Sequence, residues 1–311
     1  MRVFDLHCDT LLELEKGADQ ASLAVSIDQM AGYERFIRLF AVFVPDELRG
    51  RHAWKHFEAL YAHFLHLTNG MLTAIDGSQD LERAKIGGVL SVESGAVLGG
   101  EIDRLAVLAK RGVKLMTLTW NGENELGYGQ RCNRGLKSFG RACVREMERL
   151  NITVDVSHLS DRGFEDVCSE TNRPFAASHS NARAVCDCRR NLTDDQISEI
   201  IRRGGLIGLN FYRNFLNPDG EKAGPEDILR HADHILSLGG QDVLCLGTDF
   251  DGAQVLTEFE NDRRLAGLQT LFSSHGYSEK LIEKILFENA YYFFEKNWKE
   301  DEKNELHQHK R

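Results

Sequence analysis

The chain has 311 residues, of which 42% are hydrophobic, and its formal net charge is −10. This length supports one barrel-sized domain or two ordinary ones, and the acidic surface would repel the phosphates of a nucleic-acid partner. No basic and apolar leader opens MRVFDLHCDT, and no run approaches the ~20 apolar residues that span a bilayer. We therefore expect a cytoplasmic protein that binds neither nucleic acid nor membrane. The sequence leaves the oligomeric state open, a homodimer included.

Apolar runs rich in β-branched residues alternate with helical patterns along most of the chain. Several runs are apolar at nearly every position, which is typical of strands covered on both faces in a parallel sheet. Eight strands that alternate with helices over about 250 residues are what a (β/α)₈ barrel requires. Strands are expected over residues 2–8, 37–44, 87–93, 113–119, 152–158, 175–180, 206–211 and 242–249, and helices over 53–68, 100–111, 138–150, 193–203, 225–238 and 278–298.

The pattern predicts an α/β fold, a single-domain TIM barrel over residues 1–298 with loops over the C-terminal face of the barrel. A doubly wound open sheet is the alternative, because the number of strands does not show whether the sheet closes. No linker, repeat or low-complexity segment divides the chain. The remaining residues, 299–311, are polar and are expected to form a disordered tail.

Side chains that bind metals or transfer protons occur where the predicted strands end. His7 and Asp9 flank Cys8 at the end of the first strand, and alternation along a strand points them to the same side. In a TIM barrel the active site lies at the carboxyl ends of the strands. Three histidines and three carboxylates there suit two divalent ions that share one bridging carboxylate. The candidates at the predicted strand ends are His7, Asp9, Glu93, His158, His179 and Asp249.

Each of these residues also has a purely structural explanation. A lone histidine such as His158 more often makes structural hydrogen bonds than binds a metal, Glu93 could cap a turn, and Asp249 could stabilise a tight loop. Asp251 competes with Asp249 as a general base, and Asp155, in the middle of its predicted strand, is expected to face the helices. The convergence of six such residues on one end of a barrel nevertheless favours a metal site.

Six segments carry a family resemblance: FDLHCDT, SVESG, DVSHLS, SHSNARAVCDCRRN, NFY and GTDFDG. Together, over residues 2 to about 295, they resemble the renal-type (membrane) dipeptidases of the amidohydrolase superfamily, in a bacterial-like cytoplasmic form. The resemblance implies a barrel that holds two Zn²⁺ ions per chain. It assigns one ion to His7 and Asp9, the second to His158 and His179, and the bridging position to Glu93.

The resemblance also implies a reaction, the hydrolysis of L-L or L-D dipeptides by a metal-bridging hydroxide. Asp249 would be the general base and acid, and the fork of Arg190 would bind the free carboxylate of the substrate. The family has a histidine after the Leu-Thr of strand four, where this chain has Trp120 followed by Asn121. We expect these two residues to contact the substrate. Either Asn121 or another loop group takes over the role of that histidine, or the preferred substrate differs.

Two other functions fit the same pattern. The metal barrel could belong to another amidohydrolase that acts on a non-peptide amide, lactam or ester, or to a metal-stabilised protein without activity. A purely structural metal site is usually closed by its ligands, so a free carboxylate at Asp249 favours an enzyme. The sequence therefore predicts a metal-dependent dipeptidase, a hydrolase with a small peptide as its substrate.

Overall fold

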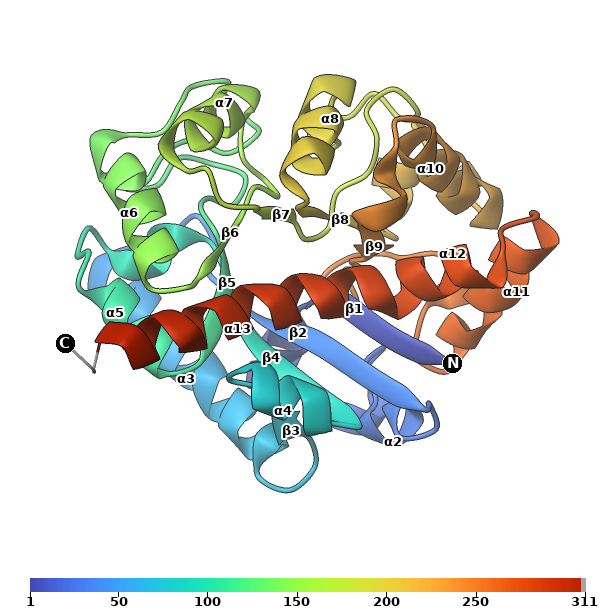
Figure 1. The fold of residues 1–311 in the computed structure, drawn as a ribbon, viewed down its shortest axis with the longest axis horizontal. Helices are drawn as coiled ribbons and strands as arrows, with labels where there is room; N and C mark the ends of the chain where they lie inside the picture. The colour runs from blue at the N-terminus through green and yellow to red at the C-terminus, as the bar shows by residue number, and fades with distance from the viewer. Residues whose placement is uncertain (309–311) are drawn as a thin grey trace.

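The computed structural model describes residues 1–308, and the side chains of residues 1–299. Figure 1 shows strands gathered at the centre of the molecule with helices around them. The strands are β1 (Arg2–Cys8), β2 (Arg35–Phe43), β3 (Thr73–Ala74), β4 (Ile86–Glu93), β5 (Val113–Thr117), β6 (Thr153–Asp155), β7 (Ala176–Ala177), β8 (Leu206–Leu209) and β9 (Leu244–Leu246).

Helices connect the strands and surround them. They are α1 (Thr10–Glu15), α2 (Ile27–Met30), α3 (Gly50–Thr68), α4 (Ser78–Arg83), α5 (Arg104–Lys110), α6 (Ser138–Arg149), α7 (Asp161–Glu170), α8 (Asp194–Arg203), α9 (Arg213–Leu216), α10 (Pro225–Ser237), α11 (Gly267–Ser274), α12 (Glu279–Glu283) and α13 (Asn289–Gln308). A π-helical turn, Lys284–Glu288, joins α12 to α13. Short 3₁₀ turns span Gln20–Ser22, Gly95–Leu98, Gly220–Lys222, Gly240–Asp242, Thr257–Phe259 and Arg264–Ala266.

The sheet closes on itself. Eight strands pair in parallel in the order β1-β2-β4-β5-β6-β7-β8-β9, and β9 pairs again with β1. The short β3 pairs with the start of β4, below the point where β5 joins it, and stays outside the ring. The predicted TIM barrel is confirmed, and the pairing of β1 with β9 excludes the doubly wound open sheet.

Helix α13 closes the N-terminal end of the barrel. It crosses the molecule in Figure 1, from the side of α12 to the side of α5, and it contacts β1, β8 and β9. The ring of Phe4, near the start of β1, stacks on Phe294 of α13 with centroids 5.5 Å apart. Inward side chains of the strands and apolar side chains of α13 form one buried cluster there. This leaves the C-terminal end of the barrel for a functional site.

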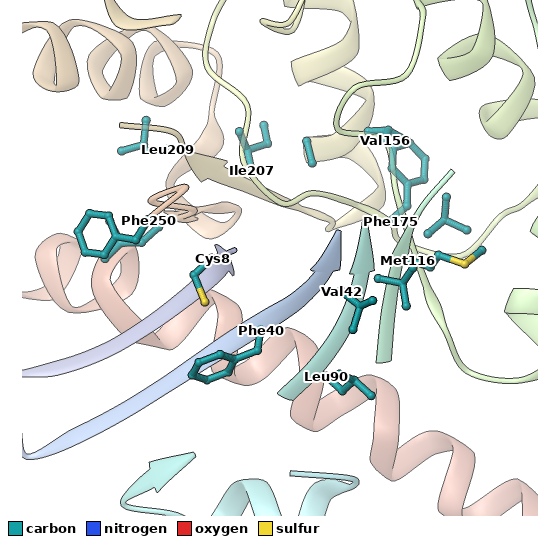
Figure 2. Packing of buried hydrophobic residues seen from close by; sticks show 14 of the residues in the cluster. Cys8, Phe40, Val42, Leu90, Met116, Val156, Phe175, Ile207, Leu209 and Phe250 are labelled. Carbon is teal, nitrogen blue, oxygen red and sulfur yellow. The ribbon is translucent and has the colours of Figure 1, made fainter. Parts of the chain in front are cut away.

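A second and larger cluster lies between the strands and the outer helices. Figure 2 shows ten labelled members, and they come from the strands or strand ends all around the ring. Cys8 and Phe40 represent β1 and β2, and Ile207 and Leu209 represent β8. Burial of these apolar side chains is the main favourable term that holds each strand and helix in place, at about 25 cal/mol per Å². This packing fixes the positions of the strand ends at the C-terminal end of the barrel.

The eight predicted strands are present, but six of them end earlier than the sequence indicated. β2 ends one residue early, at Phe43, and β5 and β8 end two residues early, at Thr117 and Leu209. β6, β7 and β9 end three residues early, at Asp155, Ala177 and Leu246. The chain beyond these points is still buried, although it has left the hydrogen-bonded ladder. The sequence pattern therefore locates the buried segment but not the end of strand pairing.

The last helix is longer than the sequence indicated. We expected a helix to residue 298, whereas α13 continues to Gln308. Lysine, glutamate and glutamine are good helix formers, so a polar composition does not by itself end a helix. The last part of the predicted tail, 309–311, lies outside the described residues.

Candidate metal centre

The six predicted site residues meet at the C-terminal end of the barrel. His7 lies in β1 and Glu93 is the last residue of β4. The other four lie just past the strands, on the loops that follow β1, β6, β7 and β9. All six are at most 9% exposed. The ones on loops are Asp9, His158, His179 and Asp249.

Glu93 lies at the centre of the group. Its Oε1 is 2.8 Å from Nε2 of His158 and 3.9 Å from Nε2 of His179. Its Oε2 is 3.4 Å from Nε2 of His7. One carboxylate therefore has a different oxygen turned to each side of the centre, the arrangement that a bridging ligand requires.

On the Oε2 side of Glu93, two further carboxylates lie near His7. The Nε2 atom of His7 is 3.4 Å from Asp9 Oδ2 and 3.9 Å from Asp249 Oδ1. The other oxygen of Asp249 accepts a hydrogen bond of 2.9 Å from the side-chain amide of Asn210. Asn210 thus holds Asp249 by Oδ2 and leaves Oδ1 turned toward the centre.

Burial and mutual repulsion change the acidity of these groups. Burial, together with the charge of Asp9, raises the pKa of Glu93 to about 7. Burial likewise raises the pKa of Asp249 above its ordinary value. For His7, burial alone would lower the pKa, but the Asp9 and Glu93 carboxylates outweigh it and raise the pKa well above its ordinary value. The centre therefore concentrates negative charge that a cation would neutralise.

His158 and His179 face each other on the Oε1 side of Glu93. Their Nε2 atoms are 3.0 Å apart. Burial, with the nearby positive charges of Arg190 and His7, lowers the pKa of both rings well below the ordinary value, so both are neutral near pH 7. On its other nitrogen, Nδ1, His158 lies 2.9 Å from Asn121 Oδ1, an acceptor, so Nδ1 carries the hydrogen and Nε2 is unprotonated.

These residues fit a metal ion. Two groups of three ligand atoms each lie within 4.8 Å of one another: His7 with Glu93 and His179, and His7 with Asp9 and Asp249. Two buried atoms among them, His7 Nε2 and Asp9 Oδ1, have no hydrogen-bond partner among the described residues. Imidazole and carboxylate ligands suit zinc and similar divalent ions. A cation would satisfy these atoms, which are otherwise costly to bury.

The backbone around the site is strained at several residues. Within residues 1–308, five residues other than glycine have positive φ, and four of them lie at the centre or beside it. A positive φ is costly for residues with a Cβ, and such residues concentrate at functional sites. The φ values are 89° for Ser94, 67° for His158, and 64° for Asp249 and Asp251.

Asp155 shows what the strain at His158 does. We expected Asp155 to face the helices, because it is three residues from His158 and so lies on the opposite side of a regular strand. The structure contradicts this: Asp155 is fully buried and bonds to Thr117 and Ser178 of the neighbouring strand ends. The left-handed turn at His158 breaks the alternation, so both side chains point into the barrel. Sequence periodicity alone could not reveal this turn.

A cavity of about 400 Å³ opens over the metal centre. Trp120 and Asn121, which we expected to contact a substrate, both line it. The ring of Trp120 packs edge-on against Phe43, with centroids 5.0 Å apart. Other residues of the cavity wall were not expected from the sequence, because none of them is a metal-binding or proton-transferring side chain at the end of a predicted strand. These are Leu12, Glu13, Lys16, Phe43, Tyr212, Phe215, Gly252, Ala253 and Gln254.

Arg190 lies behind this wall and is only 3% exposed. Its guanidinium donates to Ser180 Oγ at 2.7 Å and to the backbone oxygen of His179 at 3.0 Å. It also lies over the ring of Phe215, 5.6 Å from the centroid. Its Nε, a buried donor, has no partner among the described residues. Arg190 is therefore rigidly held beside the centre with a donor to spare.

Asp251, the competitor of Asp249, is occupied elsewhere. Its carboxylate accepts from the hydroxyl of Thr10 at 2.7 Å and from the backbone amides of Ala24 and Val25 at 2.8 and 3.4 Å. These bonds tie the loop after β9 to the start of α1 and to the segment that follows α1. Asp251 lines the cavity but is engaged in holding a loop, so the geometry favours Asp249 as the free carboxylate.

Gly252 leaves the room that Asp9 needs, and this gives a prediction. A Cβ on Gly252 would lie 2.0 Å from Asp9 Oδ2 and 3.0 Å from Asp249 Oδ1. Gly252→Ala should therefore displace Asp9 and reduce catalytic efficiency by about 10²-fold, the scale of a 1 Å misplacement. Gly224→Ala is the control, because a Cβ there meets nothing within 4 Å. Steady-state rates and bound metal are measured for both; equal activity in the two variants would contradict the prediction.

Comparisons with known proteins agree with this geometry. The model of the membrane dipeptidase family (peptidase family M19) matches residues 1–308. An uncharacterized protein in the pqqA 5′ region of Klebsiella pneumoniae is 31% identical over 235 residues, which cover 71% of this chain and 87% of that protein. None of the helices in residues 1–308 combines the length and apolar character needed to cross a membrane.

Two crystal structures share the fold over almost their whole length. One is the dipeptidase AC, a metallopeptidase of family M19, with a TM-score of 0.89 and 29% identity. The other is a metallopeptidase from Rhodobacter sphaeroides bound to a phosphinate mimic of the dipeptide L-Ala-D-Ala, with a TM-score of 0.89 and 28% identity. Each alignment covers 96% of this chain and 99% of the other. The chain thus belongs to the membrane dipeptidase family, peptidase family M19, and its enzyme class is that of the metal-dependent dipeptidases, which are hydrolases.

Proposed function

We propose that this protein is a binuclear zinc dipeptidase that hydrolyses L-L or L-D dipeptides. The observation that carries the proposal is the position of Glu93, whose two oxygens face different histidines. In this proposal His7 and Asp9 hold one ion, His158 and His179 hold the other, and Glu93 binds both. Bound zinc would polarise the scissile carbonyl and lower the pKa of a nucleophilic water.

Asp249 moves the proton in this proposal. Its Oδ1 faces the centre while Asn210 holds Oδ2, so one oxygen is free to accept a proton. Oδ1 would take the proton of the attacking water and deliver it to the nitrogen of the leaving amine. Burial raises the pKa of Asp249 and so brings that pKa closer to neutral pH. A carboxyl group with such a pKa can accept a proton and return it more readily.

Arg190 and the cavity wall position the substrate. The spare Nε of Arg190 and its charge suit the free carboxylate of a dipeptide. Trp120 and Asn121, in the wall of the cavity, would contact the substrate near the scissile bond. The phosphinate mimic of L-Ala-D-Ala on the Rhodobacter sphaeroides relative supports dipeptides, including those with a C-terminal D-residue.

One feature favours an alternative substrate. Trp120 stands where the resemblance leads us to expect a histidine, and its indole offers a single hydrogen-bond donor and no positive charge. Another amidohydrolase reaction, on a non-peptide amide, lactam or ester, would use the same metal centre. The substrate panel described next separates the two reactions.

Removal and return of zinc test the proposal. The chelator-treated protein should lose its activity, and two equivalents of Zn²⁺ per chain should restore hydrolysis of L-L and L-D dipeptides. The panel includes the same dipeptides as C-terminal amides, which lack the carboxylate and should be poor substrates. Metal content is measured by elemental analysis alongside the rates. A protein with two bound zinc ions that cleaves neutral amides or esters but no dipeptide would establish the alternative.

A further inference from the structure

A chain of three side chains leads from the barrel interior to His179. The Oδ2 atom of Asp155 is 2.5 Å from Ser178 Oγ, and Ser178 Oγ is 2.7 Å from His179 Nδ1. Asp155 and Ser178 are fully buried, and His179 is 1% exposed. Because Nε2 of His179 faces Glu93, the chain reaches the ring from the side opposite the proposed metal.

The hydrogen bonds of Asp155 set the direction of this chain. Its Oδ1 accepts from the backbone amides of Ser157 and Ser178, both at 2.9 Å, and these groups can only donate. Its Oδ2 accepts from the hydroxyls of Thr117 and Ser178. The single hydroxyl hydrogen of Ser178 is thereby given to Asp155. The Ser178 oxygen must then accept from His179, so the hydrogen of the imidazole is on Nδ1.

We propose that Asp155 and Ser178 are positioning residues that fix the tautomer of His179. With the hydrogen on Nδ1, Nε2 keeps its lone pair directed at the centre, as a metal ligand requires. The inference rests on the proposed role of His179 as a zinc ligand and adds to it the groups that prepare the ligand. Neither Asp155 nor Ser178 touches the substrate or the reacting atoms.

The same result is reached at His158 with different residues. Asn121 Oδ1 lies 2.9 Å from His158 Nδ1 and also accepts from Gln130 Nε2 at 3.2 Å. That second bond identifies the Asn121 atom as the acceptor, so His158 also carries its hydrogen on Nδ1. Both histidines of the proposed second ion thus have a partner at Nδ1 that leaves Nε2 without a hydrogen. A metal ligand requires this tautomer.

Asp155→Asn is the most informative variant. It reverses the direction of the hydrogen bonds from residue 155 to His179, and the new side chain has nearly the same size as the old one. The Asn oxygen can still accept from the two backbone amides, which places its NH₂ group where Oδ2 was. That group donates to Ser178, so the Ser178 hydroxyl turns to His179 Nδ1 and the imidazole hydrogen moves to Nε2. We expect the affinity for one of the two zinc ions to fall by about 10–100-fold, the range for loss of a ligand's hydrogen-bond partner.

The control is Thr117→Val, which removes another hydroxyl donor from the same Oδ2 atom but lies outside the chain to His179. Zinc titration by calorimetry and the ¹⁵N shifts of the His179 ring in metal-free protein are measured for both, with His179→Gln to assign the signal. Asp155→Asn should show hydrogen on Nε2 and weakened binding, whereas Thr117→Val should match the unmodified protein. An unchanged tautomer and unchanged zinc affinity in Asp155→Asn would overturn the inference.

Two further outcomes are informative. If Asp155→Asn does not fold, Ser178→Ala replaces it: the ring then loses its Nδ1 partner, and we expect a mixture of tautomers together with weaker zinc binding. A single Nδ1–H tautomer in Ser178→Ala would refute the positioning role. If the unmodified protein binds no zinc, the proposed function fails, while the ring shifts still decide whether Asp155 sets the tautomer.

Discussion

Asp249→Asn should lower kcat for dipeptides by roughly 10²–10⁴-fold, the usual contribution of a positioned acid–base group. An asparagine side chain has nearly the same shape, and its oxygen can still accept from Asn210, but it cannot take a proton from water. Because Asp249 Oδ1 also belongs to one of the groups of potential metal ligands, zinc content is measured with the rates. A loss of activity with two zinc ions still bound identifies a proton-transfer role.

Asp251→Asn is the matched control, since it makes the same chemical change two residues away. Asp251 accepts three hydrogen bonds, from Thr10, Ala24 and Val25, so its loss should weaken the loop and lower the free energy of unfolding. Its kcat should stay within a few-fold of the unmodified protein, because the carboxylate is committed to these donors. If Asp251→Asn instead abolished turnover and Asp249→Asn did not, the assignment of the base would have to be exchanged.

The sequence was sufficient to locate the centre because the barrel imposes a simple rule. Parallel strands all end on one side, so polar residues at the ends of apolar runs must come together. His7, Glu93 and Asp249 could be identified in this way although they are far apart in the chain. The rule is insensitive to the exact strand ends, and for that reason the early end of β9 at Leu246 did not matter.

The environment of each side chain was beyond the reach of sequence patterns. The alternation rule placed Asp155 outside the barrel, because nothing in the residues DVSH signals the positive φ of His158. Asn121 was expected to contact the substrate, but the sequence did not indicate that its side-chain oxygen forms a hydrogen bond with His158. Both cases depend on hydrogen bonds between loops that are distant in sequence. Such bonds become visible only when the strands have been placed.

A buried ion network behind the centre was also missed. Arg38 of β2 is completely buried between two carboxylates, with Nη2 2.9 Å from Asp5 Oδ2 and Nη1 2.7 Å from Asp262 Oδ1. Asp5 in turn accepts from the backbone amide of Thr248 at 2.8 Å and from its hydroxyl at 2.6 Å. Thr248 precedes Asp249, so the network joins the barrel wall to the loop that carries the proposed base.

Arg38→Met should destabilise the protein by about 3–5 kcal/mol, because it leaves two buried carboxylates without their cation. Burial raises the pKa of Asp262 to about 6 even beside Arg38, which shows how costly the charge is there. A carboxyl whose pKa is higher in the folded state binds protons on folding, so stability falls as pH rises through that pKa. The deficit of Arg38→Met relative to the unmodified protein should therefore be larger at pH 8 than at pH 5.

Urea unfolding at both pH values measures this deficit. The matched control is the triple variant Arg38→Met, Asp5→Asn and Asp262→Asn, which removes all three charges together. It should recover part of the lost stability, and its remaining deficit should depend much less on pH, because no uncompensated charge remains in the barrel wall. A single Arg38→Met variant as stable as the triple variant at pH 8 would mean that the carboxylates do not need the arginine. The hydrogen bonds of Thr248 to Asp5 would then be enough to hold the loop that bears Asp249.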